Sequence, residues 1–290
     1  MLHRLPDLRE IHDTINEANQ VLGCDVLELD TEKALTSTIA TQLALLISAV
    51  AVTRALQAKG SRPDLVCGMS VGAFGAAVTS GSISFEDALP FVRLRAELTE
   101  KAYPKGYGLS AVVGLTEQKL AKIVNEINRP ESPVFMANLN APLQIVIAGS
   151  DNGMDAVLER AKQEGASSAR RLEVNVPSHC PLLQDVASEL TRYGATVGMR
   201  APDLLYISNR RARGLRDPDS IREDLATNIA HPVRWHDSIM AAYERGIRVF
   251  IELPPGHTLT NLVAAAFPDA RCLAVADVSI ESAARLAGNQ

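Results

Sequence analysis

The chain has 290 residues, of which 47% are hydrophobic, and a formal net charge of −5 at pH 7. This length suffices for one large domain or for one domain that carries a smaller insert. The mild acidity excludes the basic footprint that is typical of nucleic-acid-binding proteins. Four cysteines, Cys24, Cys67, Cys180 and Cys272, are scattered without paired metal-binding spacing. We therefore expect reduced thiols in a cytoplasmic protein and no metal site.

The N-terminal segment and the longest apolar run bear on targeting. Met1 to Glu10 is charged, which is not typical of a signal peptide. The run from Leu43 to Val52 is far shorter than the roughly twenty residues of a transmembrane helix. We therefore expect a buried helix there and no membrane partner.

The first hundred residues predict mainly helices. The expected helices cover residues 7–20, 38–59, 73–78 and 84–102, and one strand covers residues 64–67. Ser84-Phe85-Glu86-Asp87 resembles a capping box at the start of the last helix. Tyr103-Pro104-Lys105-Gly106 is expected to end that helix.

The pattern changes between residues 107 and 173. The expected elements alternate as strand, helix, strand, strand, helix and strand, at residues 109–114, 116–127, 133–138, 144–149, 151–163 and 169–174. This order is the signature of a ferredoxin-like fold. We therefore predict a ferredoxin-like (βαββαβ) subdomain at residues 107–173. It would be inserted into a large α/β catalytic domain that comprises residues 1–106 and 174–290.

Helices and short strands alternate again after the insert. Helices are expected at residues 181–193, 221–228, 235–244 and 259–265, and strands at residues 204–208, 249–253 and 272–276. This alternation predicts an α/β fold with a mostly parallel sheet and helices on both faces. The expected core is like that of the α/β-hydrolases.

A GxSxG motif, Gly68-Met69-Ser70-Val71-Gly72, lies between the strand at residues 64–67 and the helix that follows. Strand, sharp turn with a central serine and helix are the parts of a nucleophile elbow. Backbone N–H groups at the start of the helix could stabilise a developing oxyanion. The motif therefore indicates acyl transfer through Ser70. The alternative is a tight turn whose serine caps the helix.

A serine nucleophile needs a general base, because an unassisted hydroxyl reacts poorly. Of the six histidines, two lie in loops at the ends of predicted strands. These are His179, where the chain returns from the insert, and His257, which follows the strand at residues 249–253. Their positions alone do not decide between them.

Five motifs occur in an order that resembles one known family. They are Gly68-Met69-Ser70-Val71-Gly72-Ala73-Phe74, Phe91-Val92-Arg93-Leu94-Arg95, Asn138-Leu139-Asn140-Ala141-Pro142, Val176-Pro177-Ser178-His179-Cys180 and Glu252-Leu253-Pro254-Pro255-Gly256. Together they resemble the malonyl-CoA:acyl-carrier-protein transacylase family over nearly the whole chain, including the insert. The resemblance is strongest to the epsilon subunit of bacterial malonate decarboxylase. Met69, where the wider family usually has histidine, favours that branch.

The resemblance implies a role for each matching residue. Ser70 would carry the malonyl ester, and His179 would act as general base and then as general acid. Arg95 would hold the free carboxylate of malonate, because a guanidinium binds a carboxylate bidentately and keeps its charge. Val71 would donate its backbone N–H to the oxyanion.

Three asparagines have supporting roles in this interpretation. Asn228 lies where the family has a glutamine, and its backbone carbonyl or side chain would orient His179. The alternative is an asparagine at the end of a helix. Asn138 and Asn140 resemble thioester or pantetheine contacts, although asparagines in a turn before Pro142 need no such role.

The implied activity is the transfer of malonyl from malonyl-CoA to the prosthetic-arm thiol of an acyl carrier protein. The expected partners are malonyl-CoA, that carrier and other malonate decarboxylase subunits, with no bound cofactor. One alternative is the housekeeping malonyl transacylase of fatty-acid synthesis. Two others are an α/β-hydrolase esterase that uses His257 with an acid such as Asp237, and a non-catalytic carrier-protein docking subunit.

One feature of the family is missing. Its members usually begin with a strand and a Gly-Gln-Gly-Ser-Gln-like loop, which supplies the second oxyanion donor, and this chain starts after that point. Loss of one such donor costs a factor of about 100 to 1,000 in rate. We therefore expect the full protein to extend upstream of Met1. The alternative is a weakened form of the enzyme.

Overall fold

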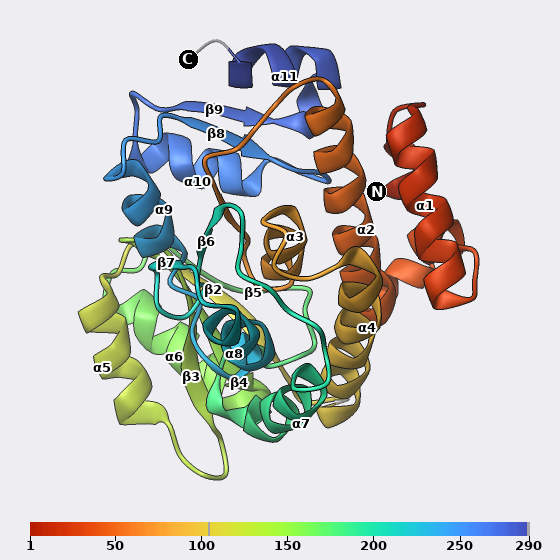
Figure 1. Cartoon of the computed structure of the whole chain (residues 1–290). Coiled ribbons are helices and arrows are strands. Elements are labelled where there is room, and N and C mark those ends of the chain that lie inside the picture. The colour runs from red at the N-terminus through yellow and green to blue at the C-terminus, as the bar shows by residue number, and fades with distance from the viewer. Residues whose placement is uncertain (104, 289–290) are drawn as a thin grey trace.

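The computed structural model describes residues 1–103 and 105–288, which form an α/β protein (Figure 1). The helices are α1 (Arg9–Leu22), α2 (Thr38–Ala58), α3 (Gly72–Thr79), α4 (Phe85–Ala102), α5 (Glu117–Ile127), α6 (Asp151–Gln163), α7 (Gln184–Gly194), α8 (Pro218–Thr227), α9 (Trp235–Tyr243), α10 (Thr258–Ala266) and α11 (Ile280–Gly288). The strands are β1 (Leu65–Cys67), β2 (Tyr107–Val113), β3 (Val134–Ala141), β4 (Gln144–Ser150), β5 (Ser168–Arg171), β6 (Leu205–Ile207), β7 (Gly214–Leu215), β8 (Val249–Glu252) and β9 (Arg271–Ala274).

The large part of the molecule contains two small sheets instead of the single, mostly parallel sheet that the sequence predicts. One sheet has the order β1-β6-β7, in which β1 and β6 are parallel and β6 and β7 are antiparallel. The other is the parallel pair β8-β9. These strands have two to four residues, and within the described residues no strand joins β1 to β8. The prediction of one continuous sheet is therefore wrong for this part of the chain.

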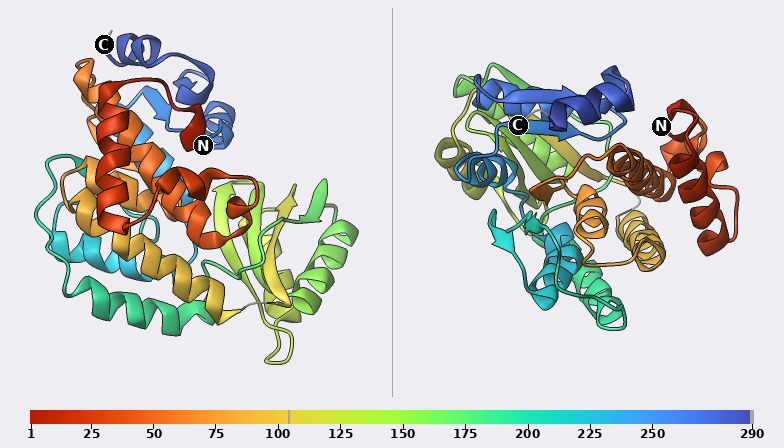
Figure 2. Two further views of the ribbon diagram at one scale, coloured as in Figure 1. Left: turned by 90° about the vertical axis from the view of Figure 1, so that its right-hand side faces the viewer. Right: turned by 45° about the horizontal axis from the view of Figure 1, so that its top comes forward.

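Residues 107–171 form a separate lobe at one side of the molecule (Figure 2). Its elements follow the expected order β2-α5-β3-β4-α6-β5, and its antiparallel sheet has the strand order β3-β4-β2-β5. The lobe has its own core, in which Leu120 of α5, Met154 of α6 and Ile147 of β4 are fully buried. This core is distinct from the one around α2, and β3 connects the lobe to the large part of the molecule through contacts with α9.

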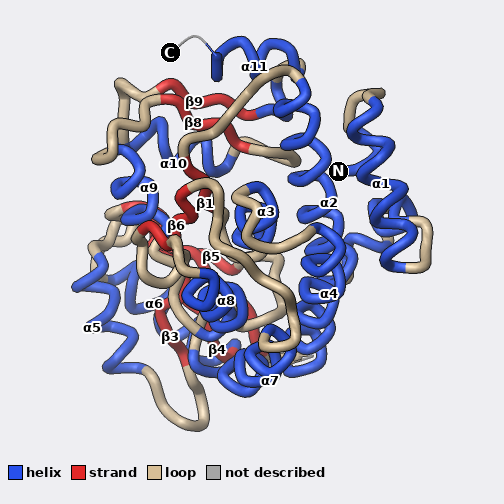
Figure 3. The backbone as a smooth tube through the Cα atoms, in the orientation of Figure 1, coloured by secondary structure: helices blue, strands red, loops and turns tan. Residues whose placement is uncertain are grey.

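Helix α2 forms the centre of the main core and packs against α1, α3 and α4 (Figure 3). It is apolar on all sides, which is typical of a helix buried within a large core. By length and composition it could cross a membrane, but 72% of its most apolar 18-residue stretch is buried inside the protein. The expected buried helix at residues 38–59 is confirmed.

The N-terminus of α4 matters because this helix carries Arg95. Ser84 caps the helix: its Oγ accepts the N–H of Asp87 at 3.0 Å, as the capping box predicts. The Asp87 carboxylate in turn accepts a hydrogen bond from the Ser84 hydroxyl at 2.6 Å. The helix ends at Ala102, at the predicted stop, of which Pro104 lies outside the described residues.

Two elements have no counterpart in the sequence-based prediction. Strand β7 has two residues and pairs with the end of β6. Helix α11 buries Ile280, Ala283 and Ala284 in a cluster that includes residues of α2. The apolar residues of α11 have helical spacing, so this helix could have been predicted.

Candidate active site

Ser70 lies in a sharp turn between β1 and α3, at the carboxyl end of a parallel strand. Its φ of 56° is left-handed, which costs about 1–3 kcal/mol for a residue with a side chain. The turn leaves no space at Gly68, where a Cβ would lie 2.0 Å from the carbonyl oxygen of Gly72. The serine itself is only half-buried. The predicted nucleophile elbow is thus present as a backbone geometry.

His179 lies directly beside the Ser70 hydroxyl, with 2.7 Å between Nε2 and Oγ. Its other ring nitrogen, Nδ1, lies 2.8 Å from the backbone carbonyl oxygen of Asn228. A carbonyl can only accept, so Nδ1 carries the proton and Nε2 is free to accept from Ser70. His179 also has a left-handed φ of 67°, and its N–H donates to the Ile229 carbonyl at 2.6 Å. This arrangement prepares the imidazole to act as a base.

The protonation states of the site follow from its burial. Burial and the charge of Arg95 lower the pKa of His179 to about 4, so the imidazole is neutral at pH 7. Burial lowers the pKa of Arg95 to about 10, so the guanidinium still carries its charge at that pH. The site therefore combines a neutral base with a buried cation.

Arg95 projects from α4 onto the serine, and its side chain is 1% exposed. Nη2 donates to Ser70 Oγ at 3.1 Å and to Asn228 Oδ1 at 3.4 Å, and Nη1 donates to Gln42 Oε1. Within the described residues no carboxylate forms an ion pair with this guanidinium, and its Nε has no partner. A buried charge without a counter-ion is available to bind an anionic substrate group.

Arg95 is not a surface arginine that pairs with the acids of its own helix. Glu97 instead pairs with Arg93 at 2.8 Å. Glu100 accepts from Ser37 and from the backbone N–H of Thr38 at the start of α2. Neither acid neutralises Arg95.

Asn228 follows the last residue of α8 and is fully buried. Its backbone carbonyl orients His179, whereas its side-chain Oδ1 accepts from Arg95. Asn228 therefore fits both alternatives: it lies at the end of a helix, and its backbone carbonyl accepts a hydrogen bond from His179. Its Nδ2 is buried without a partner.

The backbone N–H of Val71 is the predicted oxyanion donor. Val71 immediately precedes α3, and no acceptor for its N–H occurs among the described residues. An unpaired N–H directly after the nucleophile is available to a developing negative charge.

Asn138 and Asn140 lie on β3. The backbone around Asn138 is paired with Val233: the Leu139 N–H donates to the Val233 carbonyl, and the Val233 N–H donates to the Ala137 carbonyl, both at 2.8 Å. No hydrogen bond connects either asparagine side chain to Ser70, His179 or Arg95 in the described part of the chain. The thioester or pantetheine contacts of the two asparagines therefore stay a prediction.

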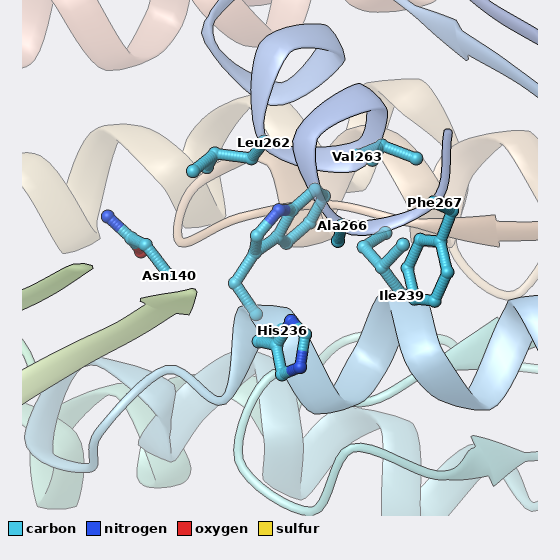
Figure 4. A pocket seen from close by; sticks show the side chains of 8 residues that line it. Asn140, His236, Ile239, Leu262, Val263, Ala266 and Phe267 are labelled. Carbon is cyan, nitrogen blue, oxygen red and sulfur yellow. The ribbon is translucent and has the colours of Figure 1, made fainter. Parts of the chain in front are cut away.

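Asn140 instead lines a pocket between β3, α9 and α10 that is too narrow to hold a water molecule (Figure 4). Apolar side chains such as Leu262 and Phe267 form most of its walls. The Asn140 Oδ1 atom and the Trp235 Nε1 atom are both buried there without a partner.

The second candidate base, His257, does not reach the serine. It lies at the start of α10, with its Nδ1 atom 3.8 Å from an Asp277 carboxylate oxygen. Asp237, the acid suggested for an esterase, pairs with Arg234 at 2.6 Å. The prediction of a His257–Asp237 pair is therefore wrong.

Two polar residues near the elbow were missed by the sequence analysis. Gln42 contacts Arg95 from α2, where a buried amide in an apolar helix is a visible signal. Asn209 follows β6 and binds the backbone on both sides of Met69. Its role depends on the pairing of β1 with β6, which the sequence does not display.

Potential metal ligands are not clustered in this region. In the part of the chain that the structure describes, no group of three or more His, Cys, Asp or Glu side chains could hold a metal ion.

A serine–histidine pair on a strand–turn–helix of an α/β protein is typical of enzymes that work through a serine ester. A family model described as "Acyl transferase domain" matches residues 10–288, and the chain belongs to this family. The malonyl CoA-acyl carrier protein transacylase of Bacillus subtilis is 33% identical over 279 residues, which are 96% of this chain and 88% of that protein. The Escherichia coli K12 protein of the same name is 33% identical over 259 residues, 87% of this chain and 83% of its own.

Solved structures show the same similarity. The malonyl-CoA:acyl carrier protein transacylase of Xanthomonas oryzae superposes with a TM-score of 0.93 at 32% identity, covering 99% of this chain and 93% of that chain. The Coxiella burnetii transacylase superposes with a TM-score of 0.91 at 32% identity, covering 96% of this chain and 89% of that chain. A malonyl-transacylase solved in complex with a type II polyketide acyl-carrier protein has a TM-score of 0.91 at 31% identity. The match covers 96% of this chain and 91% of that chain.

Proposed function

We propose that this protein transfers a malonyl group from malonyl-CoA to the thiol of an acyl carrier protein, through an ester on Ser70. The carrying observation is the contact of one hydroxyl with two groups: Ser70 Oγ lies 2.7 Å from His179 Nε2 and 3.1 Å from Arg95 Nη2. The first group can remove the proton, and the second can bind a carboxylate. Relatives at 33% identity are named for this reaction.

In the first half-reaction, His179 takes the hydroxyl proton as Ser70 Oγ attacks the thioester carbonyl. The negative charge that develops on the carbonyl oxygen is stabilised by the Val71 N–H. The carbon–sulfur bond then breaks, and His179 returns the proton to the departing CoA thiolate. The products are the malonyl ester of Ser70 and free CoA.

In the second half-reaction, the thiol of the carrier's prosthetic arm repeats these steps in reverse. His179 removes the thiol proton, the sulfur attacks the ester carbonyl, and the proton returns to Ser70 as the bond to Oγ breaks. Throughout, Arg95 holds the distal carboxylate of the malonyl group. Only one methylene separates that carboxylate from the reacting carbonyl, which fits a guanidinium that lies next to the nucleophile.

The carrier of fatty-acid synthesis is a better-supported acceptor than a malonate decarboxylase subunit, because the compared relatives are named malonyl CoA-acyl carrier protein transacylases. The decarboxylase context rests on Met69 alone. Transfer rates to the two purified carriers would distinguish these acceptors, and genes for decarboxylase subunits next to this one would favour the second.

We also propose that residues 107–173 form a ferredoxin-like subdomain within a large catalytic domain of residues 1–106 and 174–290. The strand order β3-β4-β2-β5 and the separate core of the lobe support this division.

Intact and peptide mass spectrometry after brief exposure to malonyl-CoA tests the proposed function. We expect a malonyl adduct on the peptide that contains Ser70, and its loss when the carrier protein is added. The matched control is Ser80→Ala, which removes a buried hydroxyl from the end of α3 and should keep the adduct, whereas Ser70→Ala should lose it. Carrier binding without any adduct would instead support the docking-subunit alternative.

A further inference from the structure

The parallel pairing of β1 with β6 brings two loops together at the same sheet edge. Ser70 follows β1, and Asn209 follows β6. Asn209 Oδ1 accepts the backbone N–H of Ser70 at 2.8 Å, and its Nδ2 donates to the carbonyl of Gly68 at 2.7 Å. One side-chain amide thus extends the strand pairing beyond β1, into the elbow itself.

Asn209 is 3% exposed, and both hydrogen-bonding atoms of its side chain are used in this contact. The contact surrounds the strained part of the turn, because Ser70 has a left-handed φ. Loss of the amide would leave a buried N–H and a carbonyl without partners and would release the backbone that carries the nucleophile.

Asn209 is held in turn by a buried carboxylate on α8. Asp224 accepts the backbone N–H of Asn209 at 3.2 Å and the hydroxyl of Tyr206 at 2.8 Å, and it also accepts from Ser208 Oγ. Burial and the charge of Asp224 raise the pKa of Tyr206 well above 10, so this phenol remains a donor. Asp224 is 4% exposed.

Asp224 and Asn228 are four residues apart, at the end of α8 and just beyond it. The backbone carbonyl of Asn228 orients the imidazole of His179. The carboxyl-terminal end of α8 therefore reaches the nucleophile through Asp224 and Asn209, and the base through Asn228.

We propose that Asn209 is a positioning residue, anchored by Asp224, which holds the backbone of Ser70 in its reactive geometry and aligns it with His179 through α8. This inference deepens the proposed function and rests on it for its catalytic meaning. It assigns Asn209 no contact with the substrate, only with the backbone of the turn.

The first test compares Asn209→Ala with a matched control, Ser238→Ala. Ser238 is 3% exposed and donates to the Ser208 carbonyl in the same loop, but it does not reach the elbow. Two rates are measured: formation of the malonyl ester, and labelling of Ser70 by a fluorophosphonate probe, which needs no malonyl group. We expect Asn209→Ala to reduce both by roughly 100-fold, as for a misplaced nucleophile, and the control to stay within about twofold.

A second variant, Asn209→Asp, distinguishes a role of Asn209 in positioning Ser70 from a role in stabilising the fold alone. The carboxylate keeps the acceptor for Ser70 but cannot donate to Gly68 until it is protonated. Burial beside that carbonyl should raise the pKa of the new carboxyl group. We expect the labelling rate of this variant, divided by that of the wild type, to rise as the pH falls from 8 to 5.5. The rates are divided because both proteins contain His179, whose titration then cancels.

A pH-independent ratio for Asn209→Asp, or wild-type labelling by Asn209→Ala, would overturn the inference. Asp224→Asn should slow labelling at least about tenfold, whereas its neighbour Glu223→Gln, which pairs only with Arg210 and Arg211, should not. If the wild type reacts with the probe but forms no malonyl ester, the proposed function fails while the role of Asn209 is still measured.

Discussion

His179 is held neutral far below the pH at which a free histidine titrates. Burial and Arg95 lower its pKa to about 4, from 6.5. Because the neutral form is the base, kcat/KM for malonyl-CoA should stay level down to about pH 5 and fall only as the pH drops through about 4. Steady-state rates between pH 4 and 8 measure this. An acid limb near 6.5 would contradict it.

The same shift affects folding. A histidine whose pKa is lower in the folded state binds more protons when unfolded, so its contribution to stability is fully present above about pH 6.5. That contribution is lost as the pH falls from 6.5 towards 4. Activity and stability should therefore decline on acidification for a shared reason, and rates below pH 5 need a check that the protein is still folded.

Arg95 should determine the choice of acyl group. Removal of one partner from a buried charge pair costs about 2–5 kcal/mol, so Arg95→Ala should reduce kcat/KM for malonyl-CoA by roughly 100-fold. The rate with acetyl-CoA, which has no second carboxylate, should change by less than about tenfold. Arg93→Ala is the matched control, since that exposed arginine pairs with Glu97 on the same helix. Equal losses with both thioesters would remove the specificity role.

At the scale of a single element, the β1–α3 turn makes opposite demands on its two glycines. A Cβ at Gly68 would lie 2.0 Å from the Gly72 carbonyl oxygen, whereas a Cβ at Gly72 would meet nothing within 4 Å. Gly68→Ala should therefore destabilise the fold by at least about 2 kcal/mol. Gly72→Ala should be neutral or stabilising by up to about 1 kcal/mol, because it lies in a helix. Urea unfolding of both variants is the measurement, and equal midpoints would contradict the geometry.

Elements with strong local signals could be predicted from the sequence, and pairing between elements could not. Helix α6 has the predicted bounds because Ser150 caps it, with its Oγ accepting the N–H of Gly153. The single sheet was wrong because strands of three or four residues do not reveal which edges meet. Strand β7 has two residues and no periodicity, so nothing local marked it.

At the scale of the whole molecule, the core of the small lobe and the core around α2 are distinct clusters, from which we predict two units of stability. Leu120 is fully buried in the small lobe, and Leu46 lies in the core around α2. A Leu→Ala change in a core costs about 2–5 kcal/mol. Leu120→Ala should therefore accelerate hydrogen exchange in β2 and β4 but not in α2, and Leu46→Ala should do the reverse. Equal acceleration everywhere by both variants would mean that the chain unfolds as one unit.

The candidate site combines residues from distant parts of the chain, and this sets what the sequence could predict. Ser70 was identifiable from its motif, whereas His179 and Arg95 were assigned through resemblance to a family. Position alone did not separate His179 from His257. Gln42 and Asn209 join the site only because α2 packs on α4 and because β1 pairs with β6. Contacts of this kind arise from tertiary structure, so no residue spacing in the sequence reveals which residues meet.

The buried guanidinium of Arg95 affects the stability of the protein without substrate. A charge that is 1% exposed and has no ion-pair partner among the described residues raises the free energy of the unoccupied state. A small dicarboxylate that binds only the folded form would relieve this desolvation, and mass action would then shift the unfolding equilibrium towards the folded protein. Substrate occupancy and conformational stability are thereby thermodynamically linked. We therefore expect the free protein to be less stable than its complex with such a dicarboxylate.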